Sequence, residues 1–305
     1  MLQRFKDSHA FVISVARLTL IAVAVGLAPA ASADDLKIGG AGPLLGTMEM
    51  LAAAFHREHP GTNVEVVPRK DGKALSMGTK KGIENGIKGV YEAAPFIGFS
   101  SEYLSPAQRA AGGRELEVAR VALVFVVSAK NPPIESITTQ QVLDIYARKM
   151  REWRPGVPVR LVRRPLNESD NTILMTNIPQ LKPLITNLLS PNSDLGKDLI
   201  PPLNDAQDSA DYIEERAAPH PGAFGTSSMN QIITETRALK ALKLDGIEPT
   251  AANVANGSYR LYKPVLLITG TNITPQMQDF ITFVQSKAGV DIFTKTGHAV
   301  AGDKH

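Results

Sequence analysis

The chain of 305 residues contains no cysteine. Disulfide bonds, thiolate metal sites and cysteine nucleophiles are therefore excluded. We also expect no metal and no cofactor. The chain has a single tryptophan, and aromatic residues make up only 6% of it, which argues against a base-stacking surface for nucleic acid. Without disulfides the protein must be held together by its core, which about 270 residues are enough to build.

Residues 1–33 have the pattern of a secretory signal. A basic start precedes the apolar run "LTLIAVAVGLAPA" at 18–30, and Ala31-Ser32-Ala33 forms a small-x-small cleavage site. The run is too short to span a bilayer with ease. We predict a cleavable signal peptide that ends before Asp34, and hence a periplasmic protein. The alternative is an uncleaved anchor.

The charge of the remaining chain is close to neutral. Removing Arg4, Lys6, Arg17 and Asp7 with the signal lowers the formal net charge from +3 to +1. No global field is then available to attract nucleic acid or a membrane surface, and neither is an expected partner.

The first third of the remaining chain alternates strand and helix. Strand patterns lie at 36–42, 63–68 and 95–101, and helix patterns at 47–59, with Thr47 as its cap, and 78–93. This order predicts an α/β fold with a mostly parallel sheet and helices on its faces. Further on, Asp245-Gly246 signals a hairpin, and the last helix pattern, 274–297, is predicted to break at Gly289.

Two long apolar strands divide the chain near 120–127 and 262–268. We interpret them as paired crossings between two lobes. Lobe 1 is then discontinuous (34–122 and 264–305), and lobe 2 (123–263) is inserted into it. Such an arrangement places a ligand cleft between the lobes.

Four short stretches combine a strand end, small residues and a helix start. They are "GAGPLLGT" (40–47), "SMGTKK" (76–81), "GFSSEYL" (98–104) and "RRPLNESDNT" (163–172). Free N–H groups at helix starts bind anions, and ligands of open α/β sheets lie at these strand ends. A single loop of this kind is common between a strand and a helix and does not by itself indicate a site. Four of them, with two arginines, predict an anion site.

Several known motifs are missing from these loops. "GAGPLLG" has the spacing G-x-G-x-x-x-G, and Pro43 removes an N–H, so it is not a dinucleotide fingerprint. No Walker loop and no G-x-S-x-G elbow occur. His56 and His59 lie three apart and lack the carboxylates of a zinc helix. With no activated nucleophile in view, we expect a binding protein and not an enzyme.

Longer segments resemble the periplasmic phosphate-binding proteins of ATP-dependent importers, the PstS-type branch of the type II periplasmic binding fold. "GAGPLL" is similar to the start G-A-G-x-x-F, "MGTKKGI" to a G-S-S-G-G-I loop and "GAFGTSS" to G-A-I-G-Y. Residues 137–164 follow I-T-x-x-x-L-x-x-I-Y-x-G-x-x-x-W-x-x-x-x-P-I-x-x-x-x-R, and "LKALKLDGIEPT" follows A-L-x-I-D-G-x-x-P-T. The resemblance implies two α/β lobes, two crossover strands and an interlobe cleft.

The resemblance also implies a site. It assigns oxyanion contacts to the N–H groups near Leu44 and Leu45, a hydroxyl to Thr79, and the grip on the ligand to Arg164. Together with their neighbours in the four loops, the candidate ligand-binding residues are Leu44, Leu45, Gly46, Thr47, Thr79, Lys80, Ser100, Ser101, Arg164, Ser169, Asp170 and Asn171.

Two departures from the family pattern affect ligand choice. Ser101 stands where the family pattern A-S-D has an aspartate, and the pattern R-x-x-x-S-G-T is matched with one extra residue before Ser169. A carboxylate acceptor favours protonated oxyanions such as phosphate and rejects sulfate. Asp170 could replace that acid or could only cap a helix, and Glu168 is a rival acceptor.

We therefore interpret the chain as a monomeric periplasmic solute-binding protein of an ABC-type importer. Its ligand would be a small inorganic oxyanion, with phosphate favoured, and its partner a membrane permease. One alternative is a sensory or scavenging protein for a different oxyanion or a phosphonate. A phosphoester hydrolase is a third, less favoured reading.

Overall fold

The computed structural model describes residues 34–130, 134–166, 168–189, 206–214 and 222–300. The predicted signal peptide lies outside these residues. None of the helices within them has both the length and the apolar character needed to cross a membrane.

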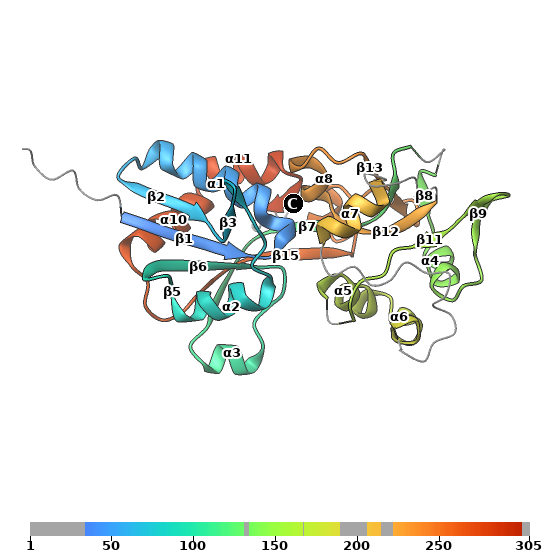
Figure 1. The fold of residues 1–305 in the computed structure, drawn as a ribbon, viewed down its shortest axis with the longest axis horizontal. Coiled ribbons are helices and arrows are strands. Elements are labelled where there is room, and N and C mark those ends of the chain that lie inside the picture. Colours follow the sequence, from blue (N-terminus) through green and yellow to red (C-terminus); the bar gives the residue numbers. More distant parts are fainter. Residues whose placement is uncertain (1–33, 131–133, 167, 190–205, 215–221, 301–305) are drawn as a thin grey trace, which may run out of the picture. The chain divides into compact units, whose positions relative to one another are not determined.

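Within the described chain, ten strands form one mixed sheet (Figure 1). Its main order is β11 (Arg160–Leu161), β12 (Ala223–Ser228), β7 (Arg114–Ser128), β15 (Tyr262–Thr269), β6 (Ala94–Ser100), β1 (Asp34–Gly40) and β2 (Thr62–Val66). The short strands β13 (Leu239–Ala241) and β16 (His298–Val300) also pair with β7, and β5 (Val90–Tyr91) pairs with β6. Separate pairs are β3 (Arg69–Lys70) with β4 (Lys73–Ala74), β9 (Glu152–Arg154) with β10 (Val157–Pro158), and β8 (Ser136–Ile137) with β14 (Lys243–Leu244).

The strand directions agree in part with the expected parallel sheet. β1 runs parallel to both β2 and β6, as the alternating pattern predicts. β15 is antiparallel to β6 and β7, and β12 is antiparallel to β7. The sheet is therefore mixed where the long apolar strands enter it.

The helices lie between these strands along the chain, singly or in consecutive runs. They are η1 (Gly42–Leu44), α1 (Leu45–Glu58), α2 (Thr79–Lys88), α3 (Pro106–Ala110), α4 (Thr139–Tyr146), α5 (Ser169–Asn177), α6 (Leu181–Leu189), α7 (Ala206–Glu214), α8 (Met229–Thr234), α9 (Ala251–Ala255), α10 (Pro275–Gln285) and α11 (Lys287–Lys295).

One hydrophobic cluster joins α1, α10 and α11 to a face of β1, β2 and β6. Phe55 of α1 is fully buried there and makes edge contacts with Phe280 and Phe283 of α10. The opposite face is covered by α2, whose Ile83 packs against Leu266 and Ile268 of β15. Helices thus cover both faces of this part of the sheet, as Figure 1 shows.

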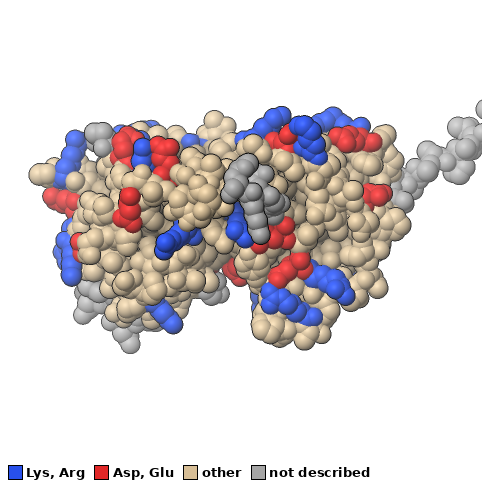
Figure 2. Space-filling view, turned by 180° about the vertical axis from the view of Figure 1, so that it is seen from behind, with Lys and Arg blue, Asp and Glu red and all other residues tan. Residues whose placement is uncertain are grey.

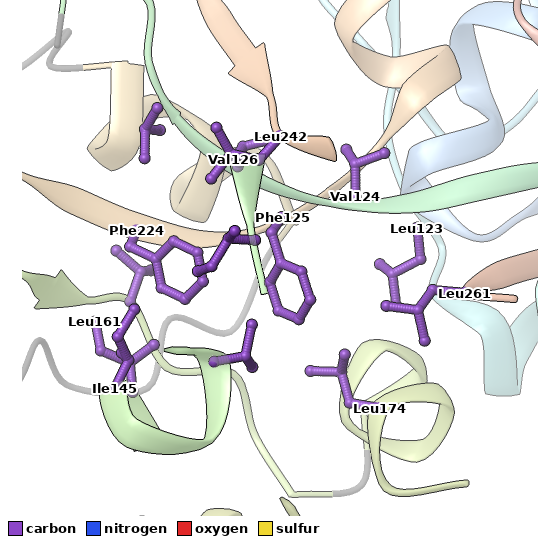
Figure 3. Close-up of a cluster of buried hydrophobic side chains, with 14 of the residues drawn as sticks. Leu123, Val124, Phe125, Val126, Ile145, Leu161, Leu174, Phe224, Leu242 and Leu261 are labelled. Atoms are coloured by element: carbon purple, nitrogen blue, oxygen red, sulfur yellow. The ribbon is translucent and has the colours of Figure 1, made fainter. Parts of the chain in front are cut away.

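A second hydrophobic cluster lies around β7, β12, α4, α5 and α6. Figure 3 shows its centre, where Phe125 and Phe224 lie with Ile145, Leu161 and Leu174. The two phenylalanine rings stack with centroids 5.4 Å apart. Each such buried side chain stabilises the fold by about 1.5–3 kcal/mol relative to its exposed state.

β7 takes part in both clusters. Val118 and Ala119 belong to the first cluster, and the residues from Ala122 to Val127 belong to the second. β7 pairs with β15 along its first half and with β12 along its second half. The domain limits at 122/123 and 263/264 stay a prediction, although a strand shared by two cores is what a crossing strand requires.

Three local predictions were wrong and one was confirmed. The helix predicted over 78–93 ends at Lys88, and β5 follows within that range. α1 begins at Leu45 with no side-chain cap, and Thr47 is fully buried inside it. The terminal helix breaks at Ser286, whose side chain caps α11, and not at Gly289. The predicted hairpin turn is present: Asp245 and Gly246 have φ of 51° and 81°, and Leu244 bridges Ile247 across it.

The described surface carries both signs of charge. On the face shown in Figure 2, lysine and arginine side chains are interspersed with aspartate and glutamate. This distribution agrees with the near-neutral charge of the chain without its first 33 residues.

Candidate functional site

The loop between β11 and α5 leads to several of the predicted site residues. β11 ends at Leu161, and two residues later Arg163 and Arg164 lead into Pro165. Arg164 is only 5% exposed. The Arg163 guanidinium donates to the carbonyl of Leu188 at 2.5 Å, whereas that of Arg164 contacts Glu168. Of the two arginines, Arg164 is therefore the one at the start of α5.

Glu168 joins Arg164 to that helix start. One carboxylate oxygen, Oε1, lies 2.6 Å from Nη2 of Arg164. The other, Oε2, accepts the backbone N–H of Asp170 at 3.0 Å, so Glu168 is the N-cap of α5. Glu168, the cap, stands four positions after Arg164. The serine of the pattern R-x-x-x-S-G-T has the same spacing from its arginine, so the cap is reached without the extra residue.

Asp170 is neither the cap nor a free acid. It is 4% exposed, and its carboxylate contacts the ammonium group of Lys263, which is 1% exposed. Thr226 on β12 donates to its second oxygen at 2.5 Å. The suggestion that Asp170 only caps α5 is thus wrong, because its carboxylate points into a buried ion pair.

The charges around Asp170 keep it ionised. Burial by itself would raise the pKa of this carboxyl. The positive charges of Lys263 and Arg164, with hydrogen bonds from Lys263 and Thr226, outweigh burial and hold the pKa below its ordinary value. Because the positive charge of Lys263 offsets that of the carboxylate, Asp170 should repel sulfate only weakly.

Asn171 and Ser169 complete the first turn of α5, and both are buried. The Asn171 amide donates to the carbonyls of Arg164 (3.0 Å) and Pro165 (2.8 Å). Asn171 thus fixes the loop that carries Arg164. Its predicted role as a ligand contact stays a prediction, as does that of Ser169.

The end of β6 presents a second group of polar residues. The hydroxyl of Ser100 donates to the Glu102 carbonyl (2.7 Å) and accepts the Glu102 N–H (2.9 Å), which forms a tight turn. Ser101 is 3% exposed, and its hydroxyl has no hydrogen-bond partner among the described residues. A buried, unpaired hydroxyl is available to a bound molecule.

Glu102 relates this turn to α5. Burial raises the pKa of the Glu102 carboxyl, the negative charge of Glu168 raises it further, and Lys263 opposes them. Ser100 also pairs with Leu266 on β15, the strand that carries Lys263, so the turn after β6 and the start of α5 are both tied to this strand. This brings the predicted residues Ser100 and Ser101 toward Arg164 and Asp170.

The start of α1 shows a different arrangement. The N–H of Leu44 donates to Ala41 (3.1 Å), and the N–H of Leu45 donates to Gly42. Both groups are thus engaged in the turn of η1. Gly46 lies so close to α8 that a Cβ there would be 2.5 Å from the hydroxyl of Thr234.

α8 also holds η1 directly. The side chain of Asn230 donates to the carbonyl of Pro43 at 2.6 Å. Thr47, on the next turn, is fully buried, and its hydroxyl has no hydrogen-bond partner within the part that the structure describes. Gly46 therefore serves close packing, whereas Thr47 keeps a free hydroxyl.

Thr79 and Lys80 lie at the start of α2. Gly78 precedes them with φ of 81°, a conformation that suits glycine, and its N–H donates to Ser76 at 3.1 Å. Thr79 is partly exposed and Lys80 is exposed. Among the described residues, no hydrogen bond or ion pair joins either side chain to the group around Arg164.

Sequence reasoning missed three residues of this group: Lys263, Thr226 and Glu102. Lys263 had a signal, because a lysine within the apolar run "YKPVLLITG" must find a buried partner. Thr226 and Glu102 had none, since threonine in a strand and glutamate in a loop are both common.

The space beside Arg164 is small. A cavity of about 10 Å³ is lined by Tyr146, Arg163, Arg164, Asn171, Ile185, Leu188 and Leu189, which is room for one water at most. Two surface cavities of about 490 and 480 Å³ lie elsewhere and contain none of the predicted site residues. In the described part of the chain, no three His, Asp or Glu side chains gather as a metal site would require.

Comparison with protein families gives a match over residues 27–288, to a family described as a PBP superfamily domain. Among individual proteins, the chain is similar to the phosphate-binding protein PstS of Bacillus subtilis (strain 168). The two are 22% identical over 258 residues, which is 84% of this chain and 77% of the relative.

Solved structures share the fold. A Clostridium perfringens substrate-binding protein with bound phosphate superposes with a TM-score of 0.68 at 24% identity, covering 88% of this chain and 99% of that one. An ABC-type phosphate transport receptor from Vibrio cholerae gives 0.58 at 21% identity, covering 87% and 98%. These relatives are named for binding and transport, which agrees with the expectation that the chain is not an enzyme.

Proposed function

This chain belongs to the PBP superfamily domain family, and from that premise we propose that it is an extracytoplasmic solute-binding protein that takes a small oxyanion, with phosphate favoured. It delivers that ligand to the membrane permease of an ABC-type importer. The names of its relatives support this proposal, since they are phosphate-binding proteins and transport receptors.

The observation that carries the ligand class is the placement of Arg164. Its guanidinium is buried, and it lies at the N-terminal end of α5, where the helix dipole also favours negative charge. A guanidinium presents paired donors that match the oxygens of phosphate or a carboxylate. The carboxylate of Glu168 already binds Arg164 and the start of α5, which supports the suitability of this place for oxyanions.

The second part of the site is the turn after β6. The buried hydroxyl of Ser101 has no hydrogen-bond partner among the described residues. The pKa of the neighbouring Glu102 is raised by burial and by the charge of Glu168, and Lys263 opposes this shift. An oxyanion held by Arg164 would have Ser101 as a further donor. Thr47 and Thr79 are additional hydroxyl candidates from the starts of α1 and α2.

Localisation follows from the same reading. The pattern of residues 1–33 supports export and cleavage before Asp34, and the relatives are binding proteins of importers. N-terminal sequencing of the protein purified from a periplasmic extract tests this directly. A start at Asp34 supports the proposal, and an intact N-terminus in the membrane fraction supports the uncleaved anchor.

Isothermal titration of the purified protein with phosphate, sulfate and molybdate tests the ligand class. We expect heat with at least one of the three, and phosphate to bind most tightly. Absence of binding to every oxyanion overturns the proposal. If binding is found but no permease accepts the loaded protein in a reconstituted uptake assay, the sensory or scavenging alternative is favoured.

A further inference from the structure

The carboxylate of Glu168 has the chemistry of the ligand that the site is proposed to take. It carries a negative charge and two oxygens, and each oxygen has a partner. Oε1 pairs with Nη2 of Arg164 at 2.6 Å, and Oε2 accepts the N–H of Asp170 at 3.0 Å. These partners are the guanidinium and the helix N–H to which a bound oxyanion would turn on this side of the site.

Hydrogen bonds within the loop hold Arg164 and Glu168 close to each other. Pro165 follows Arg164, and the N–H of Glu168 closes a turn to the Pro165 carbonyl at 3.1 Å. Asn171 holds the carbonyls of Arg164 and Pro165 from the other side. Arg164 and Glu168 are therefore kept within reach of each other.

Glutamate is an unusual residue for this position. Serine, threonine, aspartate and asparagine are the preferred helix caps, and Ser169 and Asp170 follow directly in the chain. Capping α5 does not require a charge, and it does not require contact with Arg164. The glutamate adds both, which points to a role beyond capping.

The Glu168 side chain can also leave. It is 22% exposed, whereas that of Arg164 is 5% exposed. Rotation of the glutamate toward solvent would release Nη2 of Arg164 and the N–H of Asp170 from their contacts with Glu168, without moving the arginine. Burial raises the pKa of the Glu102 carboxyl in the turn after β6, and the negative charge of Glu168 raises it further, so the two carboxyl groups repel each other when both are ionised.

We propose that Glu168 is an internal competitor for the oxyanion, and that displacing it determines both the affinity and the selectivity of the protein. The inference rests on the proposed function of this site. A ligand binds only when it interacts with Arg164 and the start of α5 better than the carboxylate does. Multiply charged tetrahedral oxyanions meet this condition, whereas monovalent anions such as formate or nitrate do not.

Two variants test the proposal. Glu168→Ser keeps a capping oxygen for the Asp170 N–H and removes the negative charge that pairs with Arg164. Glu168→Gln keeps the size of the side chain and removes the same negative charge. The matched control is Glu248→Gln, which removes a glutamate charge from an exposed pair with Lys243. Thermal unfolding of each variant checks that it is folded.

The measurement is isothermal titration with inorganic phosphate and with formate. We expect both Glu168 variants to bind phosphate at least tenfold more tightly than the wild type, about 1.4 kcal/mol, and to gain formate binding. The Glu248 variant should match the wild type.

Other results separate the inference from the proposed function. If the wild type binds phosphate and the Glu168 variants bind it equally, the inference is overturned and the proposed function stands. If they bind it more weakly, Glu168 is a ligand contact, and the inference is again overturned. If neither the wild type nor the variants bind any oxyanion, the proposed function fails and the inference fails with it.

Discussion

The carboxylate of Asp170 on α5 and the ammonium group of Lys263 on β15 form a buried ion pair, although this helix and this strand lie far apart in the sequence. Thr226 from β12 donates to the same carboxylate. The start of α5 is thereby fixed to the long strand that also pairs with β7. The geometry of the proposed anion site depends on this pair, although neither residue has to touch the ligand.

Breaking this pair should be costly. Asp170→Asn leaves the Lys263 charge buried without a counterion, so we expect the free energy of unfolding at pH 7 to fall by about 3 kcal/mol or more. Urea denaturation measures the loss. The double variant Asp170→Asn with Lys263→Met should recover much of it, because no unpaired charge remains.

The effect of Asp170 should depend on pH. The pKa of Asp170 is held below its ordinary value, so the carboxylate stabilises the fold above its unfolded pKa of about 3.9 and loses this effect as the pH falls through the folded pKa. The stability difference between wild type and Asp170→Asn should therefore shrink in urea denaturation below about pH 4. A difference that stays constant down to pH 2 contradicts this.

Arg164 should dominate oxyanion binding, and Arg163 should not. Arg164→Ala removes a buried guanidinium from the site, and we expect phosphate to bind at least 30-fold more weakly, about 2 kcal/mol. Arg163→Ala is the matched control, since its guanidinium is bonded to the Leu188 carbonyl. Equal losses in titration calorimetry would show that the second arginine shares the ligand.

Selectivity between phosphate and sulfate should respond to position 101. The paired carboxylate of Asp170 cannot accept a proton-bearing oxygen freely, and Ser101 offers a hydroxyl in its place. We expect the wild type to bind phosphate and sulfate with affinities within about tenfold of each other. Ser101→Asp should weaken sulfate more than phosphate, since a carboxylate repels an oxyanion that carries no proton. Competition titrations at pH 7 give the ratio.

His298 should make the protein less stable in mild acid. It is 1% exposed on β16, and burial lowers its pKa to about 4. The unfolded chain takes up a proton below about pH 6.5 and the folded chain does not, so the free energy of unfolding should fall by about 3 kcal/mol between pH 6.5 and 4. His298→Gln should show a shallower slope in denaturation between these values. An unchanged slope would mean that other groups cause it.

Gly46 should tolerate no side chain. A Cβ at this position would lie 2.5 Å from the Thr234 hydroxyl, where α1 approaches α8. Gly46→Ala should destabilise the protein by about 1–3 kcal/mol. Gly61→Ala is the control, because nothing lies within 4 Å of its Cβ position. Equal melting temperatures of the two variants would show that α1 and α8 can separate at no cost.

Much of the fold could be predicted because its signals are local. The alternation of strand and helix patterns predicted the parallel arrangement of β1, β2 and β6, and the resemblance predicted the type II periplasmic binding fold that the related structures share. Asp245-Gly246 predicted its turn because two adjacent residues with positive φ are sufficient to form it. Arg164 was identified by its place in a motif.

The rest of the site could not be predicted in this way. The stretch "NESDN" contains four residues of the preferred capping types, two asparagines, a serine and an aspartate, and glutamate is not one of these types. Glu168 is the cap because Arg164 lies within reach of its other oxygen, and Asp170 turns inward because Lys263 lies beneath it.

The sequence by itself determined most of the segments that form strands and helices, and it placed an arginine before a helix start. Only the tertiary structure decided which carboxylate faces which cation. A charged side chain removed from water must pair with whatever opposite charge the fold brings near, and that partner can come from any distance along the chain. For this protein the partners are Glu168 with Arg164 and Asp170 with Lys263.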